Sequence, residues 1–262
     1  NIGLDAGSTT LKIVVTDSQG EIIYSDYQRH HADIVRTLSA SLCKLKDEKG
    51  DFSARMQVTG SAGMGLSERY GIPFTQEVVA APEVIERKFP QVRTLIDIGG
   101  EDSKIIFFND KMQADIRMNG NCAGGTGAFI DQMSAIMGVT PSELGQLAEE
   151  ATNIYPIASR CGVFYKTDIQ NLISLNVKRE DIAASIFNAV ATQVISTLSR
   201  GSDIKPMIFL CGGPFAFIPA LRKAFKEKLD AKDEDLIFSE YASVVPAWGA
   251  SLNCQDTETE SH

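Results

Sequence analysis

The feature that most constrains this chain is a strand, an acidic glycine turn and a second strand, a unit that occurs twice. Two apolar runs, 2–4 and 11–16, flank Asp5-Ala6-Gly7-Ser8-Thr9-Thr10. Ninety-two residues after Asp5, the segment Asp97-Ile98-Gly99-Gly100 repeats the arrangement. In each unit a carboxylate stands at a strand end, beside a turn of small residues whose backbone amides can approach an anion. The sequence therefore indicates that one structural plan is used twice.

Hydrophobic periodicity predicts a mixed first part and a mainly helical second part. Strands are expected at 2–4, 11–16, 21–24, 56–59, 92–98 and 104–108, with a helix at 32–46. The second part has helical spacing at 126–137, 142–150, a segment beginning near 161, 179–198, 220–229 and 246–252, with one strand at 207–210. The polar, acidic end of the chain, 255–262, is expected to be disordered.

Charge and apolar runs exclude two classes of partner. The 25 Lys and Arg residues are scattered and are outnumbered by 34 Asp and Glu residues, which argues against a surface for nucleic acid. The longest apolar stretch, Met207–Leu221, is interrupted by glycines and prolines and falls short of the ~20 apolar residues that span a membrane. We therefore expect a soluble protein that binds neither nucleic acid nor a membrane.

Histidine and cysteine usage limits the metal chemistry and the compartment. Only three His residues occur, too few for a zinc or non-haem iron centre built from His. The five Cys residues are an odd number in a chain without a signal peptide, which favours reduced thiols and a cytoplasmic location. The chain begins with Asn1 inside an apolar run instead of with Met, so we expect it to derive from a longer protein.

Three glycine turns together indicate a nucleotide site. Neither the Walker spacing nor the Rossmann GxGxxG occurs, so the first turn, with Lys12 close by, would bind phosphate as part of a hairpin. Alone, such a turn is more typical of a hairpin without a ligand. The Asp97 turn repeats it, and Cys211-Gly212-Gly213-Pro214 adds a third turn at a strand end.

In order and spacing, these turns resemble the two phosphate loops and the adenosine loop of the actin, Hsp70 and hexokinase superfamily. The resemblance implies an α/β, ribonuclease H-like fold with mixed sheets flanked by helices, in which two lobes close on Mg-ATP. Lobe I would span 1–92, with the helix at 242–254 packing back on it. Lobe II would span 93–241 and carry Cys122 and Cys161.

Carboxylates at the first two turns are the candidate catalytic groups. Asp5 would hold Mg²⁺ through its water shell, and Asp97 or Glu101 would orient the attacking water. The sequence does not rank Asp97 above Glu101, and Glu101 and Asp102 are equally consistent with exposed hairpin carboxylates. A further segment, Gly125-Thr126-Gly127, either contacts phosphate or ribose or only caps the helix that follows it.

Two cysteines precede helical segments. Cys122 stands in Asn121-Cys122-Ala123-Gly124-Gly125 and Cys161 in Ser159-Arg160-Cys161-Gly162, where a helix dipole favours the thiolate. Two thiolates make half of a 4Fe-4S site, so a homodimer sharing one cluster would use both, and an intramolecular redox disulfide is the rival interpretation. We expect Cys43, Cys211 and Cys254 to be inert, buried thiols.

The cysteine segments and Asp97-Ile98-Gly99-Gly100-Glu101-Asp102-Ser103-Lys104 resemble one family from Ile2 to about Leu252. It comprises the activators, component A, of 2-hydroxyacyl-CoA dehydratases and the ATP-binding subunits of benzoyl-CoA reductase, the BadF/BadG/BcrA/BcrD type. The segments 212–215 and 245–249 are similar to activase modules fused within longer chains.

This resemblance implies a homodimer with one 4Fe-4S cluster that passes one low-potential electron to a partner dehydratase or reductase as ATP is hydrolysed. Reduced ferredoxin or flavodoxin would donate the electron, and ATP would close the cleft and re-aim the cluster. Two other functions remain open. A sugar or carboxylate kinase of the same fold would need neither cysteine, and an ATP-sensing module would bind nucleotide without hydrolysing it.

Overall fold

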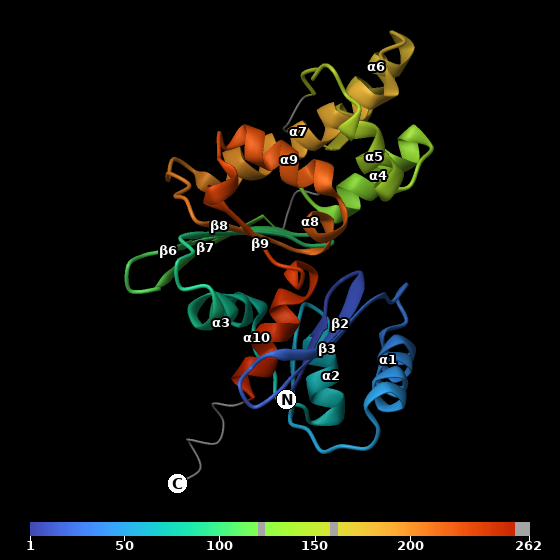
Figure 1. Ribbon diagram of the computed structural model, residues 1–262. Helices are drawn as coiled ribbons and strands as arrows, with labels where there is room; N and C mark the ends of the chain where they lie inside the picture. Colours follow the sequence, from blue (N-terminus) through green and yellow to red (C-terminus); the bar gives the residue numbers. More distant parts are fainter. Residues whose placement is uncertain (120–123, 158–161, 255–262) are drawn as a thin grey trace. The chain divides into compact units, whose positions relative to one another are not determined.

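Two separate β-sheets organise the residues that the computed structural model describes, which are 1–119, 124–157 and 162–254. Each sheet belongs to its own unit of the chain. The first unit comprises Asn1–Pro90 with Val244–His262, and the second comprises Gln91–Ser243 (Figure 1). The chain therefore leaves the first unit once and returns to it with its last helix.

The first unit is built on a four-stranded sheet of order β3-β2-β1-β4. Its strands are β1 at Ile2–Ala6, β2 at Thr10–Thr16, β3 at Ile22–Arg29 and β4 at Met56–Thr59. β1 is antiparallel to β2 and parallel to β4. This arrangement places the central strand β1 beside both of its neighbours along its whole length, with Asp5 near its end.

Helices cover both faces of this sheet. On one face Leu4, Ile13 and Val58 share an apolar core with α1 (Ile34–Lys49) and α2 (Gly63–Tyr70). Because side chains alternate along a strand, Gly3 and Asp5 lie on the other face. That face receives α10 (Val245–Asn253), which packs against α3 (Glu77–Lys88).

Glycines let α10 pack closely in the first unit. A methyl group added at Gly3 would overlap the carbonyl oxygen of Ala247, and one added at Gly249 would overlap the carbonyl oxygen of Ala80. The Trp248 indole anchors the same helix, because its Nε1 donates a hydrogen bond of 3.1 Å to the carbonyl of Gly20. Backbone contacts thus hold the returning helix on β1 and α3.

The second unit repeats the hairpin plan in a five-stranded sheet of order β7-β6-β5-β8-β9. Its strands are β5 at Thr94–Ile98, β6 at Ser103–Phe108, β7 at Ala114–Asn119, β8 at Ile208–Cys211 and β9 at Leu236–Phe238. β5 is antiparallel to β6 and parallel to β8. β5 therefore occupies in this sheet the place that β1 occupies in the first.

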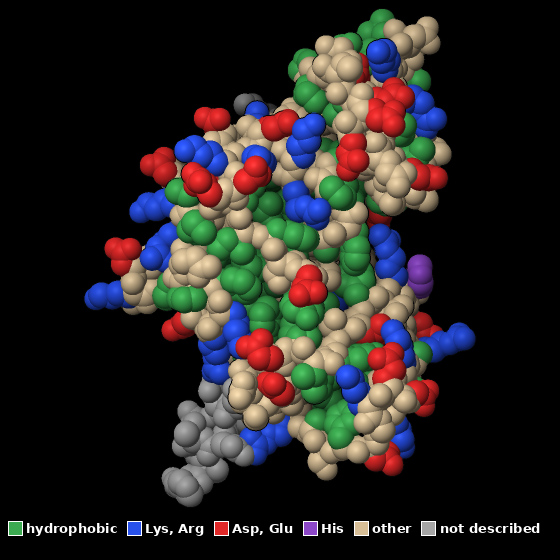
Figure 2. All heavy atoms as spheres, viewed as in Figure 1, with side chains coloured by type: hydrophobic (Ala, Val, Ile, Leu, Met, Phe, Trp, Pro, Cys, Tyr) green, Lys and Arg blue, Asp and Glu red, His purple; other side chains and the backbone are tan. Residues whose placement is uncertain are grey.

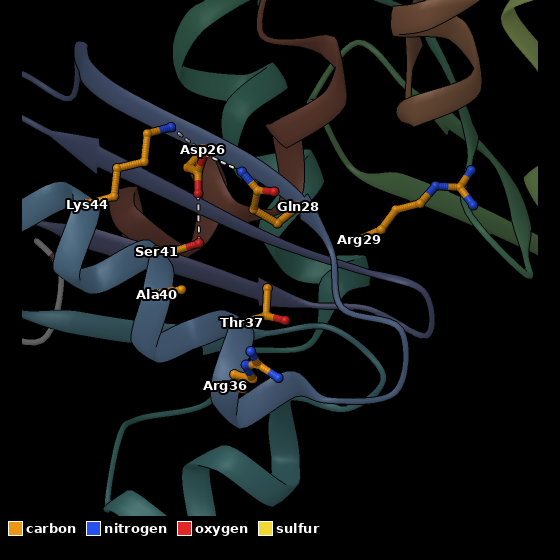
Figure 3. Close-up of a pocket in the computed structure, with 8 residues that line it drawn as sticks. All are labelled: Asp26, Gln28, Arg29, Arg36, Thr37, Ala40, Ser41 and Lys44. Carbon is orange, nitrogen blue, oxygen red and sulfur yellow. Dashed lines mark hydrogen bonds and ion pairs between the residues drawn. The ribbon is translucent and has the colours of Figure 1, made fainter.

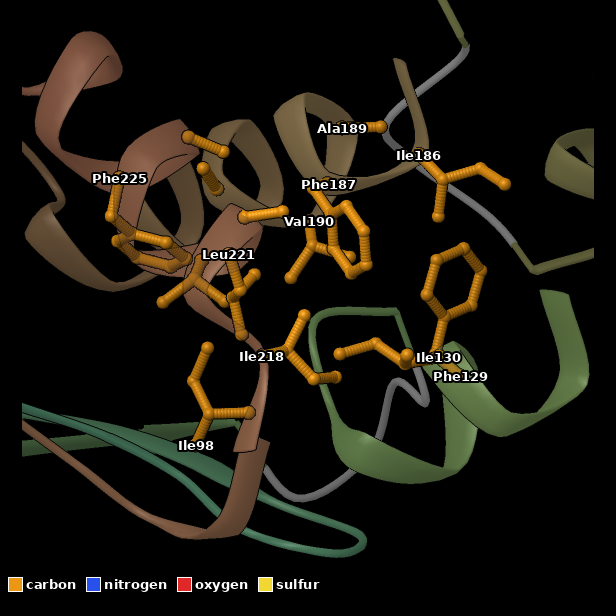
Figure 4. Close-up of a cluster of buried hydrophobic side chains, with 14 of the residues drawn as sticks. Ile98, Phe129, Ile130, Ile186, Phe187, Ala189, Val190, Ile218, Leu221 and Phe225 are labelled. Carbon is orange, nitrogen blue, oxygen red and sulfur yellow. The ribbon is translucent and has the colours of Figure 1, made fainter. Parts of the chain in front are cut away.

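Helices gather on one face of the second sheet, where Ile96, Ile98 and Ile105 join their apolar core (Figures 1 and 4). They are α4 at Gly127–Met137, α5 at Pro141–Glu149, α6 at Gly162–Ser174, α7 at Arg179–Ser199, α8 at Gly213–Phe217 and α9 at Pro219–Lys228. Short 3-10 turns occupy Asp233–Asp235 and Ala242–Val244. Figure 4 shows Phe129, Phe187 and Phe225 spread through this core, on the side of the sheet to which Ile98 points.

Most predicted elements are present, and the structure adds helices and strands that the prediction lacked. The sequence pattern does not predict α2, because Gly60 precedes the helix and Gly63 and Gly65 lie in its first turn. The helix α3 carries Pro82 inside it, which breaks the sequence signal for a helix. The strands β7 and β9 are sheet edges, the first largely exposed and the second only three residues long, and the prediction included neither.

One described helix meets the length and composition of a membrane span, contrary to the sequence-based expectation that no segment approaches it. This helix is α7, and 61% of its apolar window is buried inside the protein. The prediction considered uninterrupted apolar runs, whereas α7 reaches the threshold with polar residues interspersed. Its buried face packs within the core of the second unit.

We predict that Gly249→Ala lowers the free energy of unfolding by about 2 kcal/mol or more, because the added methyl overlaps Ala80 backbone. Gly65→Ala in α2 is the matched control, since its methyl meets no atom within 4 Å. The control should be neutral or stabilising by up to about 1 kcal/mol through helix propensity. Denaturant unfolding of both variants tests this, and equal effects would contradict the packing assigned to α10.

Candidate functional site

The first acidic turn, residues 7–10, joins β1 to β2 and is closed by a 3.0 Å hydrogen bond from the Gly7 amide to the Thr10 carbonyl. Asp5 is 1% exposed and lies in register with Lys12 on β2. The Lys12 Nζ is 2.7 Å from the Asp5 Oδ2. A buried carboxylate therefore stands beside the turn with its charge paired.

The second acidic turn, residues 99–102, has the same construction in the second unit. The Gly99 amide donates a 2.9 Å hydrogen bond to the Asp102 carbonyl. Asp97 is 4% exposed and lies in register with Lys104. The Lys104 Nζ is 3.7 Å from Asp97 Oδ2 and 2.9 Å from Asp102 Oδ2. Each turn thus carries an acid and a cross-strand lysine seven positions later.

A third strand completes the likeness between the units. The parallel neighbour of Asp5 is Thr59, which Gly60 follows, and the parallel neighbour of Asp97 is Cys211, which Gly212 follows. Gly60 and Gly212 have φ of +95° and +101°, which favours glycine. A methyl at Gly60 would overlap Asp5 Oδ1, and one at Gly212 would lie 2.7 Å from Asp97 Oδ1. Each carboxylate is therefore packed between a lysine and a glycine backbone.

The Lys12 ammonium remains charged in this setting. Burial lowers its pKa, but the charge of Asp5 and the hydrogen bond to it, with smaller contributions from Tyr27 and Glu77, raise the pKa above its ordinary value. A positive group at the first turn is therefore maintained at neutral pH. The Lys12 ammonium can form an ion pair with a phosphate oxygen in addition to its ion pair with Asp5.

Both turns offer unused hydrogen-bond donors, which is what a phosphate group requires. Within the described part of the chain, the amides of Ser8 and Thr9 and those of Gly100 and Glu101 donate to no protein acceptor. Beside Asp5, the buried Thr59 hydroxyl also has no partner among the described residues. Free amides suit phosphate oxygens, and a carboxylate with a free hydroxyl suits a hydrated Mg²⁺, so the residues fit Mg-ATP.

The first two residues of α4 restrain the second turn. The Gly127 amide donates to the Gly99 carbonyl at 2.9 Å, and the Ala128 amide donates to the Gly100 carbonyl at 2.7 Å. Thr126 is fully buried and caps α4 through a 3.4 Å hydrogen bond from the Phe129 amide. The helix-capping alternative for this segment is thus realised. The amide of Gly127 is already bonded, while phosphate or ribose contact by Gly125 and Thr126 stays a prediction.

The third glycine turn begins α8. Gly212 donates its amide to the Ala242 carbonyl at 2.8 Å, and Gly213 with Pro214 forms the first turn of the helix. Of the two carboxylates that the sequence would allow as exposed hairpin residues, Glu101 is exposed, whereas Asp102 is partly buried and forms an ion pair with Lys104. No sequence pattern assigned a role in the site to Lys104, Thr59 or Gly60. The equal spacing from acid to lysine in both units was the signal that identifies Lys104.

Cys122 and Cys161, the predicted cluster ligands, lie outside the described residues. Across the described residues, no group of three or more His, Cys, Asp or Glu side chains is arranged to hold a metal ion. Cys211 and Cys254 are buried as predicted, and burial raises the pKa of the Cys254 thiol. The prediction for Cys43 was wrong, because it is exposed on the solvent side of α1.

A polar pocket of about 340 Å³ between β3 and α1 is a structural feature of the first unit (Figure 3). Asp26 is 7% exposed there and accepts hydrogen bonds from Ser41 at 2.7 Å, Lys44 at 3.0 Å and Gln28 at 3.1 Å. The side chain of Arg36 points away from Asp26. The buried charge is satisfied within the protein, and the ion pair joins the helix to the sheet.

Surface charge shows no single-sign patch on the face drawn in Figure 2, where basic and acidic side chains are interspersed. The 25 basic residues and 34 acidic residues give a net charge of −9. This face therefore provides no continuous basic stripe for a phosphate backbone.

Comparison with known proteins covers almost the whole chain. The sequence pattern of the BadF/BadG/BcrA/BcrD ATPase family matches this chain over residues 2–253. The (R)-2-hydroxyglutaryl-CoA dehydratase activating ATPase of Acidaminococcus fermentans is 29% identical over 96% of this chain and 95% of its own length. The 2-hydroxyisocaproyl-CoA dehydratase activator of Clostridioides difficile is 30% identical over 99% of this chain and 96% of its own length.

Solved structures agree with these relatives. The crystal structure of A. fermentans (R)-2-hydroxyglutaryl-CoA dehydratase component A matches with a TM-score of 0.89 at 27% identity, covering 99% of each chain. The C. difficile 2-hydroxyisocaproyl-CoA dehydratase activator with bound ADPNP matches with a TM-score of 0.86 at 28% identity, covering 100% and 98%. A glucokinase from Streptomyces griseus matches at 0.55 and 13% identity, which shows the fold alone. The predicted actin- and hexokinase-like fold is thereby confirmed.

We predict that Gly212→Ala is more destabilising than Gly201→Ala. Both glycines have positive φ, +101° and +81°, so both substitutions carry backbone strain of about 1–2 kcal/mol. Only the methyl at position 212 also meets Asp97 and the Ile98 carbonyl, whereas nothing lies within 4 Å at position 201. Thermal unfolding should place Gly212→Ala about 4 °C or more below the control. Equal midpoints would contradict the close approach.

The Asp26 ion pair generates a pH prediction. Burial raises the pKa of Asp26, but hydrogen bonds from Ser41, Gln28 and Lys44 outweigh it and lower the pKa below its ordinary value. Its stabilisation is therefore complete above the unfolded pKa near 3.9 and is lost as pH falls through the folded pKa.

We expect Asp26→Asn to cost about 2 kcal/mol at pH 7 and progressively less below about pH 4, measured by denaturant unfolding. Asp51→Asn is the control, since Asp51 also lies 3.0 Å from a lysine of α1, Lys46, but is 88% exposed. Its stability should equal that of the wild type. A pH-independent cost at Asp26 would contradict the role of its charge.

Proposed function

Because the chain belongs to the BadF/BadG/BcrA/BcrD ATPase family, we propose that it is an ATPase that activates an acyl-CoA dehydratase or reductase by ATP-driven electron transfer. The family match over residues 2–253 carries this proposal. Relatives that align over nearly the whole chain are named dehydratase activators. The paired acidic turns supply the groups that ATP hydrolysis needs.

We assign roles in ATP hydrolysis to the two turns. The free amides of Ser8 and Thr9, with Lys12, would bind phosphate oxygens, and Asp5 would hold Mg²⁺ through its water shell. Asp97 would orient the attacking water. Its burial at 4%, against the exposure of Glu101, favours Asp97 for that role. Bound ADPNP in a related activator supports nucleotide binding by this fold.

The electron-transfer part of the proposal rests on two cysteines. Cys122 and Cys161 would each supply one thiolate, and a homodimer would supply the four that a 4Fe-4S cluster takes. Such a cluster supplies one-electron chemistry at low potential. One electron would come from reduced ferredoxin or flavodoxin and pass to the partner protein, as ATP becomes ADP and phosphate in the cytoplasm.

ATP can drive this transfer only through unequal binding. A nucleotide shifts a conformational equilibrium by its difference in affinity for the two states and by nothing more. In the second unit, the Gly127–Gly99 and Ala128–Gly100 hydrogen bonds connect the turn directly to α4. A change at the turn on hydrolysis would therefore reach the helix that follows Cys122 in sequence.

The test is iron and acid-labile sulfide per chain in protein purified without oxygen. We expect about two of each per chain, and their loss in Cys122→Ser and in Cys161→Ser. Cys43→Ser is the matched control, since Cys43 is an exposed free thiol and should leave the iron content unchanged. Iron retained in both cluster variants would contradict the ligand assignment.

Measurement of ATP turnover tests the ATPase part of the proposed function. Wild-type protein should hydrolyse ATP, and Asp97→Asn should reduce kcat by about 100-fold or more while still binding nucleotide. Asp203→Asn, outside both turns, should leave turnover unchanged. Phosphotransfer to a small alcohol by a protein lacking both cysteines would establish a kinase instead. A wild-type rate equal to that of Asp97→Asn would establish a sensor.

A further inference from the structure

His30 is a buried imidazole that packs against the first acidic turn. It follows the last residue of β3 and is 5% exposed, whereas the adjacent His31 is exposed. No sequence pattern assigns it a role, because the low number of His residues only argues against a metal centre built from His. Its contacts in the first unit are specific, because they involve both the main chain and the side chain.

Two hydrogen bonds connect His30 to the turn. Its amide donates to the Thr9 carbonyl at 3.2 Å, and its ring Nε2 lies 3.1 Å from the Gly7 carbonyl oxygen. The Gly7 amide is itself bonded to the Thr10 carbonyl. Both polar groups of Gly7 are therefore fixed, and so is the start of the segment that carries the free amides of Ser8 and Thr9.

A third hydrogen bond sets the tautomer of the ring. The Ala32 amide donates to His30 Nδ1 at 3.1 Å, so Nδ1 is an acceptor and the proton lies on Nε2. The Nε2–H then donates to the Gly7 carbonyl. Positive φ angles at His31 and Ala32, 45° and 65°, bring the Ala32 amide back to the ring.

The second unit supplies independent support. Gly99 holds in the second turn the place of Gly7 in the first, and its carbonyl also accepts a hydrogen bond, from the amide of Gly127 at 2.9 Å. Both turns therefore restrain the same carbonyl. In one unit the donor is the amide of a helix N-terminus, and in the other it is a histidine side chain.

We propose that His30 is a positioning residue for nucleotide binding, which holds the Gly7 carbonyl so that the Ser8 and Thr9 amides are ready for phosphate oxygens. This inference rests on the proposed function, since it takes ATP as the ligand of the first turn. Preorganised donors bind an anion more tightly because less conformational freedom is lost on binding. His30 itself touches no phosphate in this role.

The test compares His30→Leu, His30→Gln and His31→Asn. Leucine removes both ring hydrogen bonds, glutamine keeps an amide donor that can reach the Gly7 carbonyl, and asparagine at position 31 tolerates its positive φ. We expect His30→Leu to raise the dissociation constant for ADPNP and the KM for ATP about tenfold, with kcat within about twofold of the wild type. Glutamine should restore the KM to within about threefold, and the control should match the wild type.

The outcomes separate this inference from the proposed function. No ADPNP binding by the wild type would refute ATP as the ligand, and with it the role of His30. Wild-type binding with an unchanged KM in His30→Leu would refute the inference alone. A reduced affinity that glutamine does not restore, with a lower midpoint of unfolding in the absence of nucleotide, would show that His30 only stabilises the fold.

A measurement on the wild-type protein covers the case in which His30→Leu does not fold. The chain has three histidines, so their ring ¹⁵N signals can be assigned by comparison with His30→Gln and His31→Asn. We expect one ring, absent from His30→Gln, in the Nε2–H tautomer, with signals that shift on addition of ADPNP. An Nδ1–H tautomer, or no shift on saturation with ADPNP, would overturn the proposal.

Discussion

The cross-strand pair of a buried aspartate and a lysine that is at most 15% exposed is the interaction on which the rest of the site depends. Asp5 with Lys12 and Asp97 with Lys104 place one negative and one positive group at the end of each central strand. A buried carboxylate without a partner would be strongly destabilising, so the lysine makes the acid possible at that depth. The same lysine leaves a cation beside a turn with free amides. The pair that stabilises each acid would therefore also serve the proposed anion binding, and both units contain it.

Backbone approach is the second constraint, and it explains the glycines. Gly60 and Gly212 adopt positive φ directly beside Asp5 and Asp97, where a methyl group would collide with the carboxylate or the neighbouring carbonyl. These residues bring a third strand against each acid. Hydrogen bonds also restrain the two acidic turns, from His30 in the first unit and from the start of α4 in the second. Each acidic turn is therefore restrained by a hydrogen bond to one of its carbonyl groups, as a preorganised phosphate site would require.

Sequence patterns located most strands and helices because alternation and helical spacing are local properties. They failed for α2, where glycines mask a helix, and for α3, where Pro82 interrupts one. At the site, Asp5, Asp97 and the glycine turns were identifiable from their order, and the family comparison confirmed the fold they imply. The roles of the individual residues stay predictions. No sequence pattern identified His30, because the role of an imidazole depends on the groups that surround it in the fold.

The sequence by itself determined the repeated hairpin with its acid and glycine turn, and the segments on which the family resemblance rests, because these depend on residue types at fixed local spacing. Only the tertiary structure decided that Thr59 and Cys211 lie beside the acids. It also decided that the Gly127 amide donates to the Gly99 carbonyl, and that the His30 ring contacts the Gly7 carbonyl. These pairs are separated by 23 to 114 residues, as the contacts of His30 and Cys211 show. Contacts over such separations follow from the packing of strands and helices, which no local pattern encodes.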